Sequence, residues 1–201
     1  MARTNALQKH LKPGRVYRRQ QLLAWSNNAD RDLQRLVRLG LLKKQSFGVY
    51  ACPRETAFGA APPEDRTLVE AFLKDDRFLL TSFSLYNTLG VGTTQLYNEQ
   101  VVYNHKRHGK MKLGNRAFDF RLKPYFPSEV TPEFLLVDLV NNLNYLAEDR
   151  EAVLRNVGAK AKEMDQKKLS RAVKSYAGAR ARKFFAGIGL ADTLNYVSAR
   201  T

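Results

Sequence analysis

Four polar side chains on one predicted helix have the chemistry to read DNA bases. A helix that starts after Asn28 and ends before Gly40 places Leu33, Leu36 and Val37 on one side at 100° per residue, and that side packs on a core. Arginine can bond guanine O6 and N7, and glutamine can bond adenine N6 and N7, when a helix enters the major groove. Asn28 is predicted to read bases as well, because it lies at the N-terminal end of the helix, where recognition helices approach the bases. The outward side carries Arg31, Gln34, Arg35 and Arg38.

A solvated charged surface is the simpler interpretation of this outward side. Arg31, Arg35 and Arg38 have the spacing i, i+4, i+7, so they repel one another unless a polyanion neutralises them. Because all three charges have the same sign, the pattern favours DNA recognition.

Further cations flank this helix in the sequence. One group precedes and opens the preceding predicted helix, and the other lies in a predicted hairpin, where it would reach phosphates or the minor groove. Phosphate contacts fix the register of a protein on DNA without reading its sequence. The predicted backbone contacts are Arg15, Arg18, Arg19, Lys43, Lys44, Gln45 and Ser46.

Signals for catalysis are weak. His105 and His108 form an H-x-x-H pattern among Lys and Arg side chains, and that cationic setting disfavours a metal ion. Asp119 lacks the second acid that two-metal chemistry needs. No glycine-rich phosphate loop is followed by Lys and Ser/Thr. We therefore predict no catalytic residues, no metal site, no cofactor and no enzymatic activity.

The distribution of charge supports a polyanionic partner. The chain has a net charge of +15 and a sequence pI of about 10.1. Residues 1–54 hold 12 Lys/Arg against 2 Asp/Glu, residues 55–149 hold 10 against 13, and residues 150–201 hold 12 against 4. Two basic regions thus flank a slightly acidic one, and basic regions bind phosphates by releasing condensed counterions.

The elements predicted for the N-terminal region follow the order of a winged helix-turn-helix. The pattern predicts helices over 4–11, 18–25 and 29–39, a short extended piece at 15–17, and a hairpin of 41–44 with 49–52. We assign residues 1–58 to this DNA-binding domain, and Gly59–Pro63 to a hinge.

Residues 64–201 are predicted as a second domain. Residues 64–123 combine helices at 64–74 and 81–89 with strands at 101–103, 110–113 and 117–121. Residues 130–196 are helical, and Thr131-Pro132-Glu133 is a strong helix start. The predicted fold class is α+β and mainly helical: a winged helix, a mixed α/β region and a helical C-terminal bundle.

The C-terminal region carries a second basic surface. On the helix that contains Leu169, Ala172 and Val173, cations lie on the opposite face. This surface could meet DNA, RNA or an acidic protein, and the sequence does not separate these partners. Its residues are Lys167, Lys168, Arg171 and Lys174.

The start of the chain shows no apolar run of signal-peptide type, and no segment is apolar enough to cross a membrane, so we expect a cytoplasmic protein without a membrane partner. Cys52 alone can form neither an intramolecular disulfide nor a zinc site, and we expect it to close a strand as a small apolar residue.

Two stretches resemble a known family, the AbiEi-type antitoxins. Residues 14–52, GRVYRRQQLLAWSNNADRDLQRLVRLGLLKKQSFGVYAC, resemble its N-terminal winged helix. Residues 81–121, with TSFSLYNTLGVGTTQ and VVYNHKRHGKMKLGNRAFDFR, are similar to its C-terminal region.

The resemblance implies a type IV toxin–antitoxin operon, found among abortive-infection (phage defence) systems. It implies that the winged helix binds inverted repeats in its own promoter and represses transcription. It further implies that residues from about 64 onward counteract a nucleotidyltransferase toxin. A winged-helix regulator without a toxin partner and an RNA-binding protein are the alternatives.

Overall fold

The computed structural model describes residues 4–26 and 28–190, and its fold is α+β. The described residues form two compact units. The first unit contains the residues up to Asp76 together with Lys110–Phe118, and the second contains Arg77–Gly109 and the residues from Asp119 onward. Among the described residues, no helix is long and apolar enough to cross a membrane.

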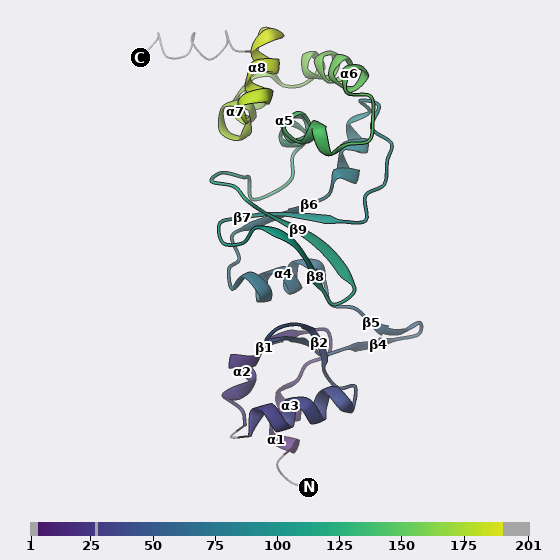
Figure 1. Cartoon of the computed structure of the whole chain (residues 1–201), viewed down its shortest axis with the longest axis vertical. Coiled ribbons are helices and arrows are strands. Elements are labelled where there is room, and N and C mark those ends of the chain that lie inside the picture. The colour runs from purple at the N-terminus through teal and green to yellow at the C-terminus, as the bar shows by residue number, and fades with distance from the viewer. Residues whose placement is uncertain (1–3, 27, 191–201) are drawn as a thin grey trace. The chain divides into compact units, whose positions relative to one another are not determined.

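The first unit starts with three helices and a three-stranded sheet (Figure 1). The sheet order is β1-β3-β2, with antiparallel pairs that set Tyr17 opposite Tyr50 and Lys44 opposite Tyr50. Gly48, with a φ of 72°, occupies the turn between β2 and β3, where the left-handed conformation suits glycine. The elements are α1 (Thr4–His10), β1 (Val16–Arg18), α2 (Arg19–Leu23), α3 (Ala29–Arg38), β2 (Lys43–Ser46) and β3 (Val49–Ala51).

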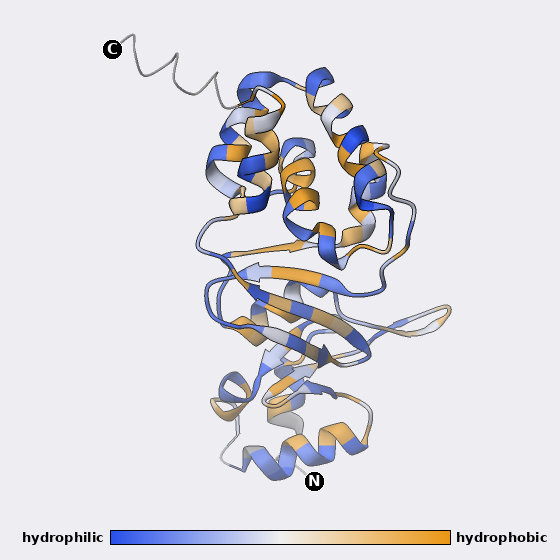
Figure 2. Ribbon diagram, turned by 45° about the horizontal axis from the view of Figure 1, so that its top comes forward, coloured by the Kyte–Doolittle hydropathy of each residue, from blue (hydrophilic) through white to orange (hydrophobic). Residues whose placement is uncertain are grey.

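A small apolar core holds these elements together. α1 and α2 each contribute one leucine, and α3 contributes two at helical spacing, in helices whose orange segments alternate with blue ones in Figure 2. The hydroxyl of Tyr17 accepts from Lys12 N–H at 2.7 Å and donates to the carbonyl of His10 at 3.2 Å, so α1 is tied to the sheet. Burying one leucine stabilises a fold by about 1.5–3 kcal/mol. The buried residues of this core are Leu7, Tyr17, Leu22, Leu33, Leu36 and Leu42.

The segment predicted as a hinge is part of a hairpin. β4 (Arg54–Thr56) pairs with β5 (Gly59–Ala61), and the prolines at 62 and 63 follow it. α4 (Asp65–Leu73) then packs against β1. The first unit therefore extends beyond residue 58 and includes α4, which the sequence prediction had assigned to the C-terminal domain.

A four-stranded sheet of order β6-β7-β9-β8 follows in the chain. Its first strand, β6 (Phe78–Thr81), was not predicted, and it is followed by a 3-10 helix, η1 (Phe83–Leu89), that ends at Gly90. The remaining strands are β7 (Gln100–Asn104), β8 (Gly109–Leu113) and β9 (Arg116–Leu122), close to the predicted ranges.

The helices of the second unit surround α5. α5 (Pro132–Asn142) is buried from Phe134 to Val140 and contacts η1, α6, α7 and α8. The predicted start is confirmed, because the Thr131 side chain accepts the N–H of Phe134 at 3.2 Å. The other helices are η2 (Leu143–Tyr145), α6 (Arg150–Glu163), α7 (Gln166–Tyr176) and α8 (Ala179–Gly187).

Candidate nucleic-acid interface

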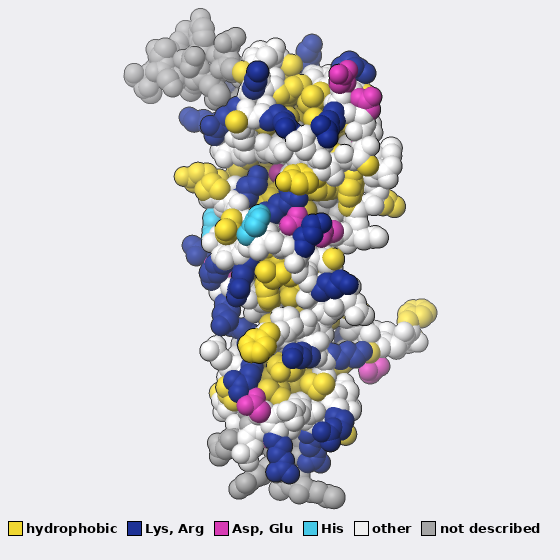
Figure 3. All heavy atoms as spheres, viewed as in Figure 1, with side chains coloured by type: hydrophobic (Ala, Val, Ile, Leu, Met, Phe, Trp, Pro, Cys, Tyr) yellow, Lys and Arg dark blue, Asp and Glu magenta, His cyan; other side chains and the backbone are white. Residues whose placement is uncertain are grey.

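The outer face of α3 is cationic and open to solvent. Leu33 and Leu36 are buried as predicted, whereas Val37 is 37% exposed and lies at the edge of the buried face. No described residue forms an ion pair with any of the three arginines of α3. Dark blue side chains gather over the region of α3 in Figure 3. The exposed residues of this face are Arg31, Gln34, Arg35 and Arg38.

The side chain of Asn28, at the start of α3, does not cap the helix. Asn28 is the N-cap residue, as predicted, but its side chain makes no capping hydrogen bond. Its N–H donates to Ser26 Oγ at 3.1 Å, and Ser26 Oγ donates to Asp32 Oδ2 at 2.5 Å. The segment before α3 is thus held by Ser26 and Asp32, and Asn28 remains exposed.

Residues of α3 and of β2, the strand that follows it, line a hollow of about 480 Å³. Gln34 and Arg38 line it from α3, and Lys44 lines it from β2. Tyr50, opposite Lys44 in the sheet, forms part of its floor. The structure therefore brings two predicted base-reading residues and one predicted phosphate contact to the same surface.

Arg19 differs from the free cation that the sequence prediction assumed. Its Nε and Nη2 donate to the two carboxylate oxygens of Asp30 at 2.8 and 2.6 Å. These hydrogen bonds lower the pKa of Asp30 and raise that of Arg19. Arg15 is exposed before β1, and the N–H of half-buried Arg18 donates to Gln21 Oε1 at 2.9 Å.

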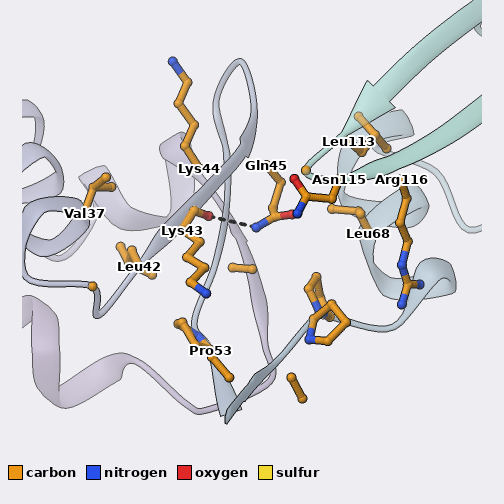
Figure 4. A pocket seen from close by; sticks show the side chains of 17 residues that line it. Val37, Leu42, Lys43, Lys44, Gln45, Pro53, Leu68, Leu113, Asn115 and Arg116 are labelled. Atoms are coloured by element: carbon orange, nitrogen blue, oxygen red, sulfur yellow. Dashed lines mark hydrogen bonds between the residues drawn. The ribbon is translucent and has the colours of Figure 1, made fainter. Parts of the chain in front are cut away.

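The predicted wing residues lie along β2, and the tip of the hairpin is Phe47-Gly48. Lys43 and Lys44 are exposed, but Gln45 and Ser46 are half-buried. The Gln45 carbonyl accepts the N–H of Gly114 at 2.7 Å, and its side chain lies where a Cβ at Gly114 would collide with it. Figure 4 shows Gln45 beside Asn115, and Gln45 is half-buried where the two lysines are exposed.

A second hollow, of about 710 Å³, lies on this side of β2. Leu42 and Lys43 line it together with Pro53, Leu68 and Leu113, and Figure 4 shows Lys43 extending towards Pro53. Leucines of α4 and β8 line this hollow beside Lys43, Gln45 and Arg116, and its lining contains no acidic residue.

The basic surface predicted near the C-terminus lies on α7. Leu169, Ala172 and Val173 are buried on its inner side. Asp165 caps the helix by accepting the N–H of Lys168 at 3.0 Å. The cations are exposed on the outer side: Lys167, Lys168, Arg171 and Lys174.

The second unit contains a buried polar network that no local sequence pattern indicates. Asp138 of α5 is 1% exposed, and its carboxylate accepts the hydroxyl protons of Tyr86 and Tyr103 at 2.8 Å each. Asn142 Nδ2 donates to the same two hydroxyls at 3.1 and 2.9 Å. Arg121 Nη1 in turn donates to Asn142 Oδ1 at 2.6 Å.

Arg121 connects this network to the surface. Its Nε donates to Asp119 Oδ2 at 2.7 Å, so Asp119, which looked isolated in the sequence, is paired. The guanidinium lies over the rings of Phe83 and Tyr145 at 5.1 and 4.5 Å, where cation–π attraction adds to the ion pair. Burial raises the pKa of Asp138 although the tyrosine hydroxyls favour its charged form.

The histidines of the H-x-x-H pattern do not converge on a site. His105 stacks on Phe126 with ring centroids 4.7 Å apart, and both histidines are exposed. Among residues 4–26 and 28–190, no group of three His, Cys, Asp or Glu is placed to hold a metal ion.

Comparison with known proteins yields a likeness of fold. No protein-family model and no curated protein matches the chain. The chain is similar to the crystal structure of the RV2827C protein from Mycobacterium tuberculosis, with a TM-score of 0.55 and 15% sequence identity. The likeness covers 92% of this chain and 75% of that one, and at this identity it concerns the fold alone.

Proposed function

We propose that the N-terminal elements form a winged helix-turn-helix that binds double-stranded DNA. In this proposal α2 and α3 are the helix-turn-helix, and the β2–β3 hairpin is the wing. The observation that carries it is the outer face of α3, on which Arg31, Arg35 and Arg38 are exposed and form no ion pair with a described residue.

This face combines groups that read bases with groups that hold phosphates. Arginine and glutamine side chains at helical spacing match the donor and acceptor pattern of the major groove. Lys44 lines the same hollow as Gln34 and Arg38, so a duplex bound on α3 would bring its backbone to Lys44.

Replacing Arg31→Ala together with Arg35→Ala tests the assignment. Each lost base contact costs about 1–3 kcal/mol, so the double variant should bind its DNA at least thirtyfold more weakly in a gel-shift assay. Arg150→Ala with Arg155→Ala is the matched control, because it removes the same charge from exposed positions on α6, outside the α7 surface. Equal binding by the α3 variant and the unaltered chain would remove α3 as the recognition helix.

We further propose that the protein represses its own promoter and counteracts a nucleotidyltransferase toxin. This proposal is supported by the resemblance of residues 14–52 and 81–121 to AbiEi-type antitoxins. It assigns repression to α3 and antitoxicity to residues outside the N-terminal elements.

Co-expression separates these two roles. The full-length chain should restore growth to cells that express the nucleotidyltransferase encoded beside it. The Arg31→Ala, Arg35→Ala variant should still restore growth while failing to repress a promoter fusion. Loss of protection in this variant, at wild-type abundance, would contradict separate surfaces for the two roles.

RNA binding is a second candidate that one observation favours. In this candidate, the exposed cations of α7 bind the phosphates of RNA, and this contact does not require a helix to enter a groove of the nucleic acid. Competition of duplex DNA against structured RNA at fixed salt distinguishes the candidates: preference for RNA, lost in the Arg171→Ala, Lys174→Ala variant, would replace the DNA proposal. A regulator without a toxin is distinguished by the absence of a nucleotidyltransferase gene beside this one.

A further inference from the structure

The tip of the β2–β3 hairpin carries an aromatic ring that is not packed into the core. Phe47 is 95% exposed and precedes Gly48 in the turn. Single exposed apolar side chains are common on proteins, so exposure by itself means little. Phe58, at the tip of the β4–β5 hairpin, is as exposed and serves as the internal comparison.

The tip with Phe47 is fastened to the start of α3, and Arg19 provides both attachments. The Arg19 N–H donates to the Gly48 carbonyl at 2.8 Å. Its guanidinium makes two hydrogen bonds to Asp30 in the first turn of α3. The turn that presents Phe47 is therefore held in position relative to the helix end that would approach DNA bases. For Phe58, the hydrogen bonds described lie within its own hairpin, between Thr56 and the residues at 58 and 59.

The strand that leads to Phe47 is basic. Lys43 and Lys44 are exposed on β2, and Lys44 shares a hollow with Gln34 and Arg38. A ring carried on a cationic hairpin can approach a groove whose walls are phosphates. The β4–β5 hairpin carries one cation and one anion, Arg54 and Glu55, and has no such bias.

From this arrangement we infer that Phe47 is an apolar wedge that enters the minor groove beside the major-groove site of α3. Apolar side chains of this kind unstack a base step and bend the duplex by about 20–90° towards the major groove. The ligand is double-stranded DNA with a deformable pyrimidine–purine step at the wedge position. The inference rests on the proposed DNA-binding function and adds a contact that bends DNA rather than reads it.

The experiment uses the full-length chain and 30-bp duplexes enriched from a random library by binding to it. The enriched duplex carries a donor and an acceptor dye at its two ends, so that bending raises energy transfer between them. Phe47→Ala should bind about tenfold more weakly and lose most of the rise in energy transfer. Phe47→Leu, which keeps an apolar wedge, should retain bending, and Phe58→Ala should match the unaltered chain in both measurements.

The outcomes separate this inference from the function on which it rests. If no duplex is enriched, both the wedge and the DNA-binding proposal are wrong. If a duplex is enriched but Phe47→Ala bends it as fully as the unaltered chain does, the wedge alone is wrong. Equal losses for Phe47→Ala and Phe58→Ala would also overturn it, because the wedge is specific to the fastened hairpin.

Discussion

The cationic face of α3 in the first unit and the network around Asp138 in the second place charged side chains in opposite surroundings. In the first unit, α3 displays Arg31, Arg35 and Arg38 on the surface without described partners. In the second unit, Asp138 is buried and satisfied by Tyr86, Tyr103 and the groups around them. Unpaired surface cations cost little in water and are available to a ligand, whereas a buried carboxylate must be satisfied from within. The contrast separates an exposed face that the proposed function uses from a network that is satisfied within the fold.

The largest effect that tests this contrast is expected at Asp138. Asp138→Ala leaves two buried tyrosine hydroxyls without their acceptor and should lower the free energy of unfolding by about 3 kcal/mol. Urea denaturation followed by circular dichroism measures it. Glu151→Ala, an exposed carboxylate with a 4.0 Å contact to Arg155, is the control and should leave the free energy of unfolding unchanged. A loss no larger than that of the control would show that the network is not structural.

A second, smaller effect concerns pH. Because burial raises the pKa of Asp138 above its ordinary value of 3.8, the folded state binds this proton more tightly than the unfolded chain does. The stability contributed by Asp138 is therefore complete below its ordinary pKa of 3.8 in the unfolded chain. It is lost as the pH rises through the higher pKa of the folded state. Relative to the wild type, Asp138→Asn should gain stability as the pH rises, in urea titrations at stepped pH. A difference that is constant with pH would contradict the raised pKa.

The helix starts of the two units offer the next comparison. Thr131→Ala removes the hydrogen bond to Phe134 N–H and should cost about 1 kcal/mol of unfolding free energy. Asn28→Ala removes no capping bond and should cost much less, while weakening DNA binding. Thermal denaturation of both variants measures the difference, and equal losses would mean that the Asn28 side chain supports its helix in solution.

The smallest effect on stability is expected at the Arg19–Asp30 pair. Both side chains are largely in solvent, at 43% and 67% exposure, so Arg19→Ala should leave the unfolding midpoint within experimental error. The same variant loses one attachment of the hairpin tip and should weaken DNA binding more than Arg15→Ala does. If Arg19→Ala lowered stability but spared binding, the pair would belong with the structural charges of the second unit.

Local patterns in the sequence predicted the elements that carry the candidate site. The spacing of Leu33 and Leu36 predicted the buried face of α3, and Gly48 marked the turn between β2 and β3. The Thr131-Pro132 start of α5 was likewise local. These signals arise from residues within one or two helical turns, so a single sequence displays them.

Other features escaped prediction because their causes lie elsewhere in the chain. β6 is a short apolar run without alternation, and β4 has no buried face whose pattern could be recognised. The network around Asp138 joins residues 35 to 52 positions away from it. The pairing of Arg19 with Asp30 joins two separate helices, α2 and α3. No periodicity within one element reports such contacts.

The β8–β9 hairpin has a consequence for how the chain is made. Lys110–Phe118 groups with the first unit although the residues on both sides of it belong to the second. The Gly114 turn that supports Gln45 is thus translated long after the N-terminal elements leave the ribosome. All residues of the first unit are present in the nascent chain only after more than half of the polypeptide has been made. Cleavage of the chain at a single site does not separate the two units. A graft of the N-terminal elements with α4 but without that turn would leave the Gln45 carbonyl without the N–H of Gly114.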